Sequence, residues 1–110
     1  MAFAPMLTRS QPNIVTEVID ELRVEYPSDP TLRSVGRVAV IGVLLRLRMP
    51  MIAVEQFRNE LDAAIARAAG PAPDPQSVLT VTAQWDQAHI SVEISGPASS
   101  ERLRHPRVYR

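Results

Sequence analysis

The chain of 110 residues contains no cysteine and no lysine. The absence of cysteine excludes disulfide bonds, thiolate nucleophiles, zinc–thiolate sites and iron–sulfur clusters. Its twelve basic side chains are all arginine and balance twelve acidic ones, so the formal net charge is zero. A neutral chain produces no long-range field toward nucleic acid or anionic lipid, and any such partner therefore requires a local patch.

Long hydrophobic runs are also lacking. The longest apolar run, residues 38–45, has eight residues, far short of the roughly 20 that span a bilayer. Residues 1–11 include apolar side chains without a positively charged start, and this pattern predicts a flexible arm rather than a signal peptide. We therefore expect a cytoplasmic protein with no membrane span.

Acid–base and metal chemistry have few candidate side chains. The only histidines are His89 and His105. His89 shares a predicted strand face with Ser91, but no nucleophile elbow or glycine-rich oxyanion loop accompanies them. His89 and Glu93 lie too far apart along a strand to hold one ion unaided. We predict no catalytic, cofactor or metal site, and hence a protein that is not an enzyme.

The first half of the chain has mainly helical periodicity, which predicts a helical region of two to three helices over residues 12–70. Residues 52–69 have the clearest pattern, and Gly70 is a natural stop. Residues 14–26 also predict an amphipathic helix, which ends because the residue before Pro27 is disfavoured in helical geometry. The apolar residues of this first stripe are Ile14, Val15, Val18, Ile19, Leu22 and Tyr26.

Residues 31–49 fit two structures. Leu32, Val35, Val38 and Val43 match a helical stripe, whereas the many β-branched residues favour a strand. A helix is preferred, with the strand left open. Because apolar residues would surround most of the helix, it would be either the most buried element or the seam of an oligomer.

The second half of the chain changes to a period of two. After a proline-rich linker at 71–76, residues 77–96 predict a β-hairpin, and residues 97–110 a basic tail. An isolated hairpin is marginally stable, so this one is expected to pack on the helices or on a second subunit, with Trp85 as its anchor. The predicted fold class is α+β, an N-terminal helical bundle followed by a C-terminal β-hairpin.

Charge is segregated along the chain. Residues 30–50 hold four arginines, Arg33, Arg37, Arg46 and Arg48, and no acid. These arginines could contact phosphates, or they could pair with an acidic surface of another subunit or with the acids of the first predicted helix. Those acids are Glu17, Asp20, Glu21 and Glu25. Pairing is preferred, because the two blocks of charge can neutralise each other.

We therefore predict a non-catalytic interaction or accessory protein that forms a homo-oligomer or binds a protein partner. The alternative is a small nucleic-acid-binding transcriptional regulator that uses the basic segment from Arg33 to Arg48. In either case the candidate contact residues are the four arginines and Trp85.

Overall fold

The computed structural model describes residues 20–71 and 74–107. A strand comes first, followed by two helices and then three strands. The elements in chain order are β1 (Asp20–Pro27), a short 3-10 helix η1 (Pro30–Leu32), α2 (Ser34–Arg46), α3 (Met51–Ala69), β2 (Val78–Trp85), β3 (His89–Ser95) and β4 (Ser100–Pro106).

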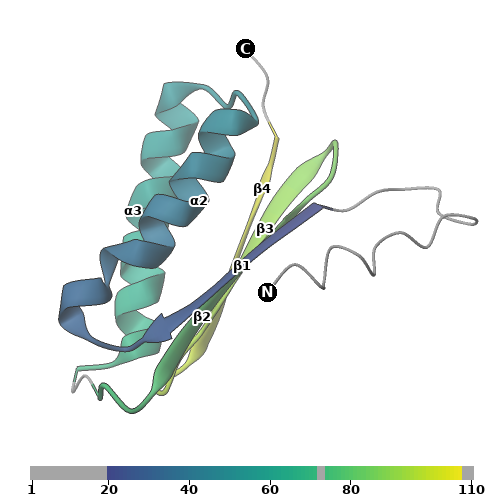
Figure 1. Ribbon diagram of the computed structural model, residues 1–110. Coiled ribbons are helices and arrows are strands. Elements are labelled where there is room, and N and C mark those ends of the chain that lie inside the picture. The colour runs from purple at the N-terminus through teal and green to yellow at the C-terminus, as the bar shows by residue number, and fades with distance from the viewer. Residues whose placement is uncertain (1–19, 72–73, 108–110) are drawn as a thin grey trace, which may run out of the picture.

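The four strands form one antiparallel sheet in the order β1-β2-β3-β4. Both helices lie on the same face of this sheet, so the molecule has two layers (Figure 1). The turn between α2 and α3 and the loop between β2 and β3 lie at one end of the molecule. The connections from β1 to α2 and from α3 to β2 lie at the other end.

The core fills the space between the helices and the sheet. Successive side chains of a strand point to opposite faces, and the apolar members of each strand point toward the helices. Val81, for example, is paired with Val24 on one side and with Ile94 on the other. The largest fully buried apolar side chains are Phe57, Leu44, Leu61, Ile65, Leu79, Ile90, Ile94, Val40, Val81 and Val92.

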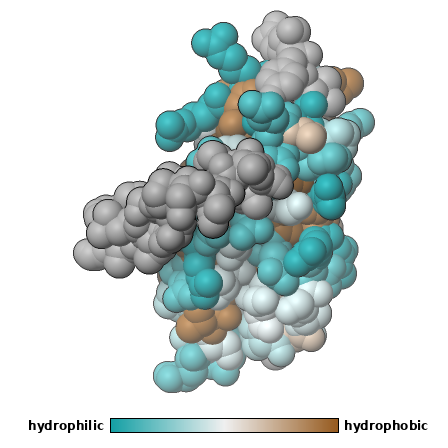
Figure 2. Space-filling model, turned by 90° about the vertical axis from the view of Figure 1, so that its right-hand side faces the viewer, coloured by the Kyte–Doolittle hydropathy of each residue, from teal (hydrophilic) through white to brown (hydrophobic). Residues whose placement is uncertain are grey.

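The other face of the sheet is lined by polar side chains, and neither α2 nor α3 lies on it. Figure 2 looks onto this side of the molecule, and the described part of the surface is mainly hydrophilic. One apolar face and one polar face are typical of an antiparallel sheet with a single covered side. The strand residues that alternate with the core positions are Glu21, Arg23, Glu25, Thr80, Thr82, Gln84, Ser91, Glu93, Arg102 and Arg104.

The predicted helical bundle is wrong, because residues 20–27 form strand β1 instead of the end of a helix. In β1, Leu22, Val24 and Tyr26 point toward the core, and β2 supplies the hydrogen-bonding partner. The sheet thus continues beyond the predicted hairpin. The predicted flexible arm at 1–11, and the part of the predicted first helix up to residue 19, lie outside the described residues.

The predicted basic tail is also corrected, because residues 100–106 form the edge strand β4. Two side-chain contacts between described residues join this strand to α3. The carboxylate of Glu101 lies 3.0 Å from Arg67 Nη2, and His105 Nε2 lies 2.7 Å from Glu60 Oε1. The His105 ring also contacts Phe57, with 4.7 Å between ring centroids.

Several predicted elements are confirmed. The ambiguous segment contains helix α2, and α3 ends at Gly70, whose φ of 83° suits glycine. The hairpin is present as β2 and β3, and it packs on the helices. In its loop, Asp86 Oδ1 accepts hydrogen bonds from the amides of Ala88 and His89, each at 2.8 Å.

Candidate interaction surface

Helix α2 has one buried side and one exposed apolar side. Its buried residues are Gly36, Val40, Val43 and Leu44. Val38 and Leu45 are 65% and 51% exposed, and at 3.6 residues per turn they lie on the side opposite these core residues. The helix is therefore apolar both toward the sheet and toward the solvent, because its sequence contains no stripe of polar residues.

The exposed apolar side chains are concentrated in the helical layer. Met51 and Ile52, in the first turn of α3, are 62% and 72% exposed, and Val35 is exposed near the start of α2. We call the set Val35, Val38, Leu45, Met51 and Ile52 the α2 surface. Among the described residues, the one other large hydrophobic side chain that is exposed is Val78, at the start of β2. Exposed apolar groups gathered in one region typically mark an interaction site.

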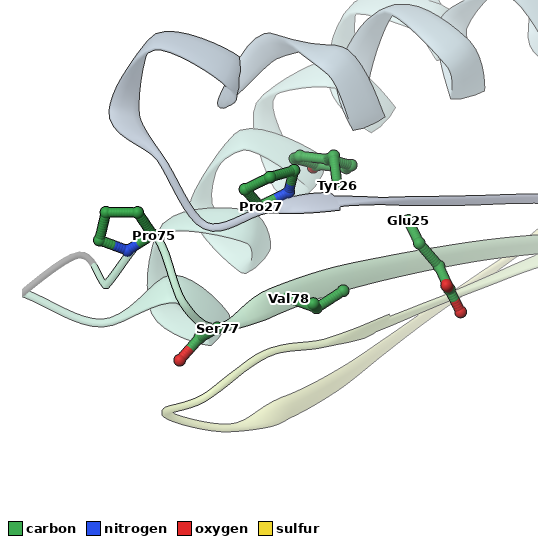
Figure 3. A pocket seen from close by; sticks show the side chains of 6 residues that line it. All are labelled: Glu25, Tyr26, Pro27, Pro75, Ser77 and Val78. Atoms are coloured by element: carbon green, nitrogen blue, oxygen red, sulfur yellow. The ribbon is translucent and has the colours of Figure 1, made fainter.

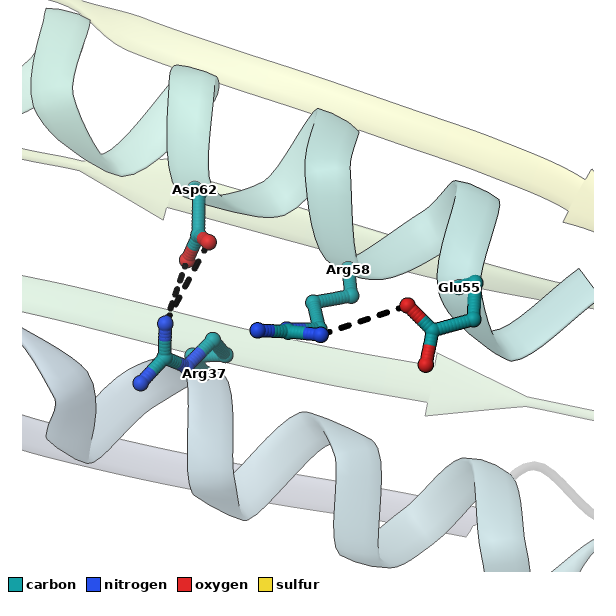
Figure 4. Close-up of polar contacts among 4 residues, drawn as sticks. All are labelled: Arg37, Glu55, Arg58 and Asp62. Carbon is teal, nitrogen blue, oxygen red and sulfur yellow. Dashed lines mark hydrogen bonds and ion pairs between the residues drawn. The ribbon is translucent and has the colours of Figure 1, made fainter. Parts of the chain in front are cut away.

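Of the four predicted arginines, Arg37 pairs within the chain. Its Nη1 atom lies 3.3 Å from Asp62 Oδ2, so the ion pair connects α2 to α3 (Figure 4). Next to it, Arg58 of α3 pairs with Glu55 at 3.2 Å, and its side chain extends toward α2. The predicted pairing of the arginines with a first helix is thus wrong, because the acidic partner comes from α3 and residues 20–27 are a strand.

Arg46 and Arg48 lie beside the α2 surface, in the last turn of α2 and in the turn that follows. Both are exposed, and in the part of the chain that the structure describes neither forms an ion pair. Arg48 has a φ of 60°, in the left-handed region that favours glycine. The end of the helical layer thus combines exposed apolar groups with two available guanidinium groups.

Arg33 lies at the other end of α2 and is half-buried near Tyr26. Burial raises the pKa of the Tyr26 phenol, and this effect outweighs the lowering by the Gly36 backbone and the Arg33 charge. The structure therefore separates Arg33 and Arg37, which contribute to packing, from Arg46 and Arg48, which face solvent.

Trp85 lies at the end of β2 and is half-buried. It packs against the core on the same strand face as Leu79 and Val81. This position agrees with the predicted contact between the hairpin and the helices. The structure does not place Trp85 in one cluster with the four arginines.

A shallow hollow of about 260 Å³ lies where the end of β1 meets the start of β2 (Figure 3). This end of the molecule is opposite the turn between α2 and α3. Its lining residues are Glu25, Tyr26, Pro27, Pro75, Ser77 and Val78. The one carboxylate among them, Glu25, pairs with Arg23 at 2.8 Å. The Ser77 hydroxyl in this lining donates a hydrogen bond to Asp74 Oδ2 at 3.1 Å.

The described residues contain no group of three His, Asp or Glu side chains that could hold a metal ion. The carboxylates with shifted pKa values stabilise local structure. Hydrogen bonds from the His89 and Ala88 amides lower the pKa of Asp86, and those from the Thr31 amide and hydroxyl lower the pKa of Asp29. None of the helices described is long and apolar enough to cross a membrane.

Comparison with protein-family models gives no match, and a search among curated proteins also finds no similar sequence. The residues that the sequence analysis did not select are Val38, Leu45, Met51 and Ile52. For Val38 and Leu45, the signal in the sequence was the apolar composition around all sides of residues 31–49. That signal became specific only when the structure placed α2 at the surface, with one side uncovered.

Proposed function

We propose that this chain is a non-catalytic interaction protein that self-associates through the α2 surface. The observation that carries the proposal is the exposed apolar side of α2. A helix that is apolar on all sides is expected either in the centre of a fold or between subunits. Here α2 lies in the outer layer of the described part of the molecule, and this position supports a contact between subunits.

The distribution of polar groups also supports the α2 surface as the site of self-association. The sheet face opposite the helices is polar, and ion pairs such as Arg102–Glu93 at 3.8 Å partly neutralise its charge. The α2 surface contains no acid, and the chain has no acidic residue from position 30 to position 54. Interfaces typically have an apolar centre depleted of charge and a polar rim, and Arg46 and Arg48 provide that rim.

Light scattering over a micromolar concentration range tests this proposal. We expect a mass above the 12.2 kDa of one chain. Val38→Asp and Leu45→Asp should each weaken association by about tenfold or more, equivalent to about 1.4 kcal/mol, because a carboxylate would be desolvated in the contact.

Val78→Asp is the matched control, since Val78 is 53% exposed but lies on β2, away from the α2 surface. The control should associate like the unchanged chain. A monomer at all concentrations, or equal effects of the three substitutions, would contradict self-association through this surface.

Nucleic-acid binding is a second candidate function, favoured by Arg46 and Arg48, which are exposed and form no ion pair with a described residue. If all four arginines from Arg33 to Arg48 contacted phosphates, log affinity for duplex DNA would fall against log salt with a slope of about −3 to −4. Arg46→Ala would reduce that slope by about one. We expect instead no binding tighter than roughly 10⁻⁵ M near physiological salt, a level typical of non-specific contact.

A further inference from the structure

We propose that two copies of the chain pair through the exposed sides of their α2 helices, with the helices antiparallel and a two-fold axis near Ile41 and Gly42. This inference rests on the proposed function, because it specifies how the α2 surface is occupied. The occupant is a second copy of this chain. Three observations on α2 support this arrangement: the spacing of its exposed residues, the space around Gly42, and the charges at its two ends.

The spacing of the exposed residues is self-complementary. Val38 and Leu45 lie on one side of α2 at equal distances from a point between Ile41 and Gly42. A two-fold axis at that point places Val38 of each copy against Leu45 of the other. This is the reciprocal contact that an isologous interface requires. No charged residue lies between these two positions along this side of the helix.

Gly42 is not needed for packing against any described residue, in contrast to Gly36. A side-chain carbon at Gly36 would lie 2.5 Å from the Tyr26 hydroxyl and 2.9 Å from a methyl group of Val81, so glycine is needed there for packing. At Gly42 nothing lies within 4 Å of such a carbon. Glycine in the middle of a helix is destabilising. A second helix that crosses closely at Gly42 accounts for its presence in the middle of the exposed side.

The charges at the ends of α2 favour the antiparallel direction. Arg46 and Arg48 lie at the C-terminal end. At the N-terminal end, Asp29 and Asp74 outnumber Arg33, and a hydrogen bond from the Ser28 amide to the Ser77 carbonyl joins the two segments that carry these acids. Antiparallel pairing places the basic end of each copy at the acidic end of the other. Parallel pairing would instead bring four arginines together, and like charges repel.

Disulfide trapping tests the antiparallel arrangement of the two α2 helices. The chain has no cysteine of its own, so every disulfide formed comes from an introduced residue. Val38→Cys and Leu45→Cys chains are mixed and oxidised with diamide, which accepts the two electrons and two protons released. Non-reducing gels and mass spectrometry then measure the mixed and self-linked dimers. We expect about tenfold more mixed dimer than either self-linked dimer, because residue 38 lies ~10 Å along the helix from its own copy, beyond disulfide reach.

A mixture of Val78→Cys and Leu45→Cys chains measures random collision and should give little dimer.

Self-linked dimers of the Val38→Cys and Leu45→Cys chains in excess over the mixed dimer would show parallel pairing and overturn the inference. A dimer in light scattering without preferential linkage would also overturn it while leaving self-association intact. A monomer in light scattering would overturn the proposed function itself.

Discussion

At the scale of single residues, Arg48 has the least favourable backbone in the described chain. Its φ of 60° places a side chain in the left-handed region, which costs roughly 1–2 kcal/mol for residues other than glycine. Helices often end in this conformation, and the residue that adopts it is usually glycine. An arginine kept there, unpaired and exposed beside the α2 surface, agrees with a side chain that contacts a partner.

A matched pair of substitutions tests this strain. Arg48→Gly should raise the free energy of unfolding by about 1 kcal/mol, because glycine adopts positive φ without steric cost. Arg46→Gly, two residues earlier and inside the helix, should lower it by about 0.5–1 kcal/mol. Urea denaturation at a concentration where the chain is monomeric measures both. Equal effects of the two substitutions would show that the backbone of Arg48 is not strained.

At the scale of elements, β1 shows why part of the fold could not be predicted. Leu22 and Tyr26 are four residues apart, a spacing that fits one side of a helix and one face of a strand equally well. What selects the strand is β2, which pairs with β1 but follows it only after both helices. For α3, by contrast, the helical spacing of its apolar residues and the stop at Gly70 were sufficient to predict the helix. Both signals lie within the helix itself and do not depend on distant parts of the chain.

Strand β4 and the candidate surface escaped prediction for similar reasons. Leu103 is the single large apolar residue of β4, so its alternation is weak, and contacts of Glu101 and His105 with α3 hold it in place. For the surface, sequence could show that α2 is apolar on all sides. It could not show which side the sheet covers, since this depends on the packing of β1 and β2 against the helix.

The contact between α3 and β4 predicts an acid-sensitive stability. Hydrogen bonds from Arg67 and then Ser99 lower the pKa of Glu101 below its ordinary value of 4.5. Between the pKa of Glu101 in the folded chain and its ordinary value of 4.5, this carboxyl therefore binds more protons in the unfolded chain than in the folded one. The stabilisation is therefore complete above pH 4.5 and is lost as the pH falls through the folded-state pKa.

Thermal unfolding of the unchanged chain and of Glu101→Gln at several pH values measures this effect. The unchanged chain should have the higher melting temperature at neutral pH, and the difference should shrink toward zero in acid. A difference that is constant from neutral to acidic pH would show that Glu101 contributes by packing rather than by charge.

At the scale of the whole molecule, the sheet predicts a gradient of local stability. β2 and β3 are paired on both sides, whereas β1 and β4 each have one neighbouring strand among the described residues. Amide hydrogen exchange should therefore be slowest in β2 and β3 and faster in β1, because edge amides open without disrupting the core. Nuclear magnetic resonance of the exchanging protein gives the rates. Equal protection of β1 and β3 would show that the molecule opens only as one cooperative unit.

The position of β1 in the chain also has a consequence for biosynthesis. A ribosome releases β1 before its partner β2 has been made, and at about 5–20 residues per second the helices between them take several seconds to follow. During that interval Leu22, Val24 and Tyr26 have no strand to pair with, whereas the helical hairpin and the β2–β3–β4 meander each assemble from neighbouring segments. The strand synthesised first is thus the one expected to join the sheet last, and it is the segment that a chaperone would need to shield.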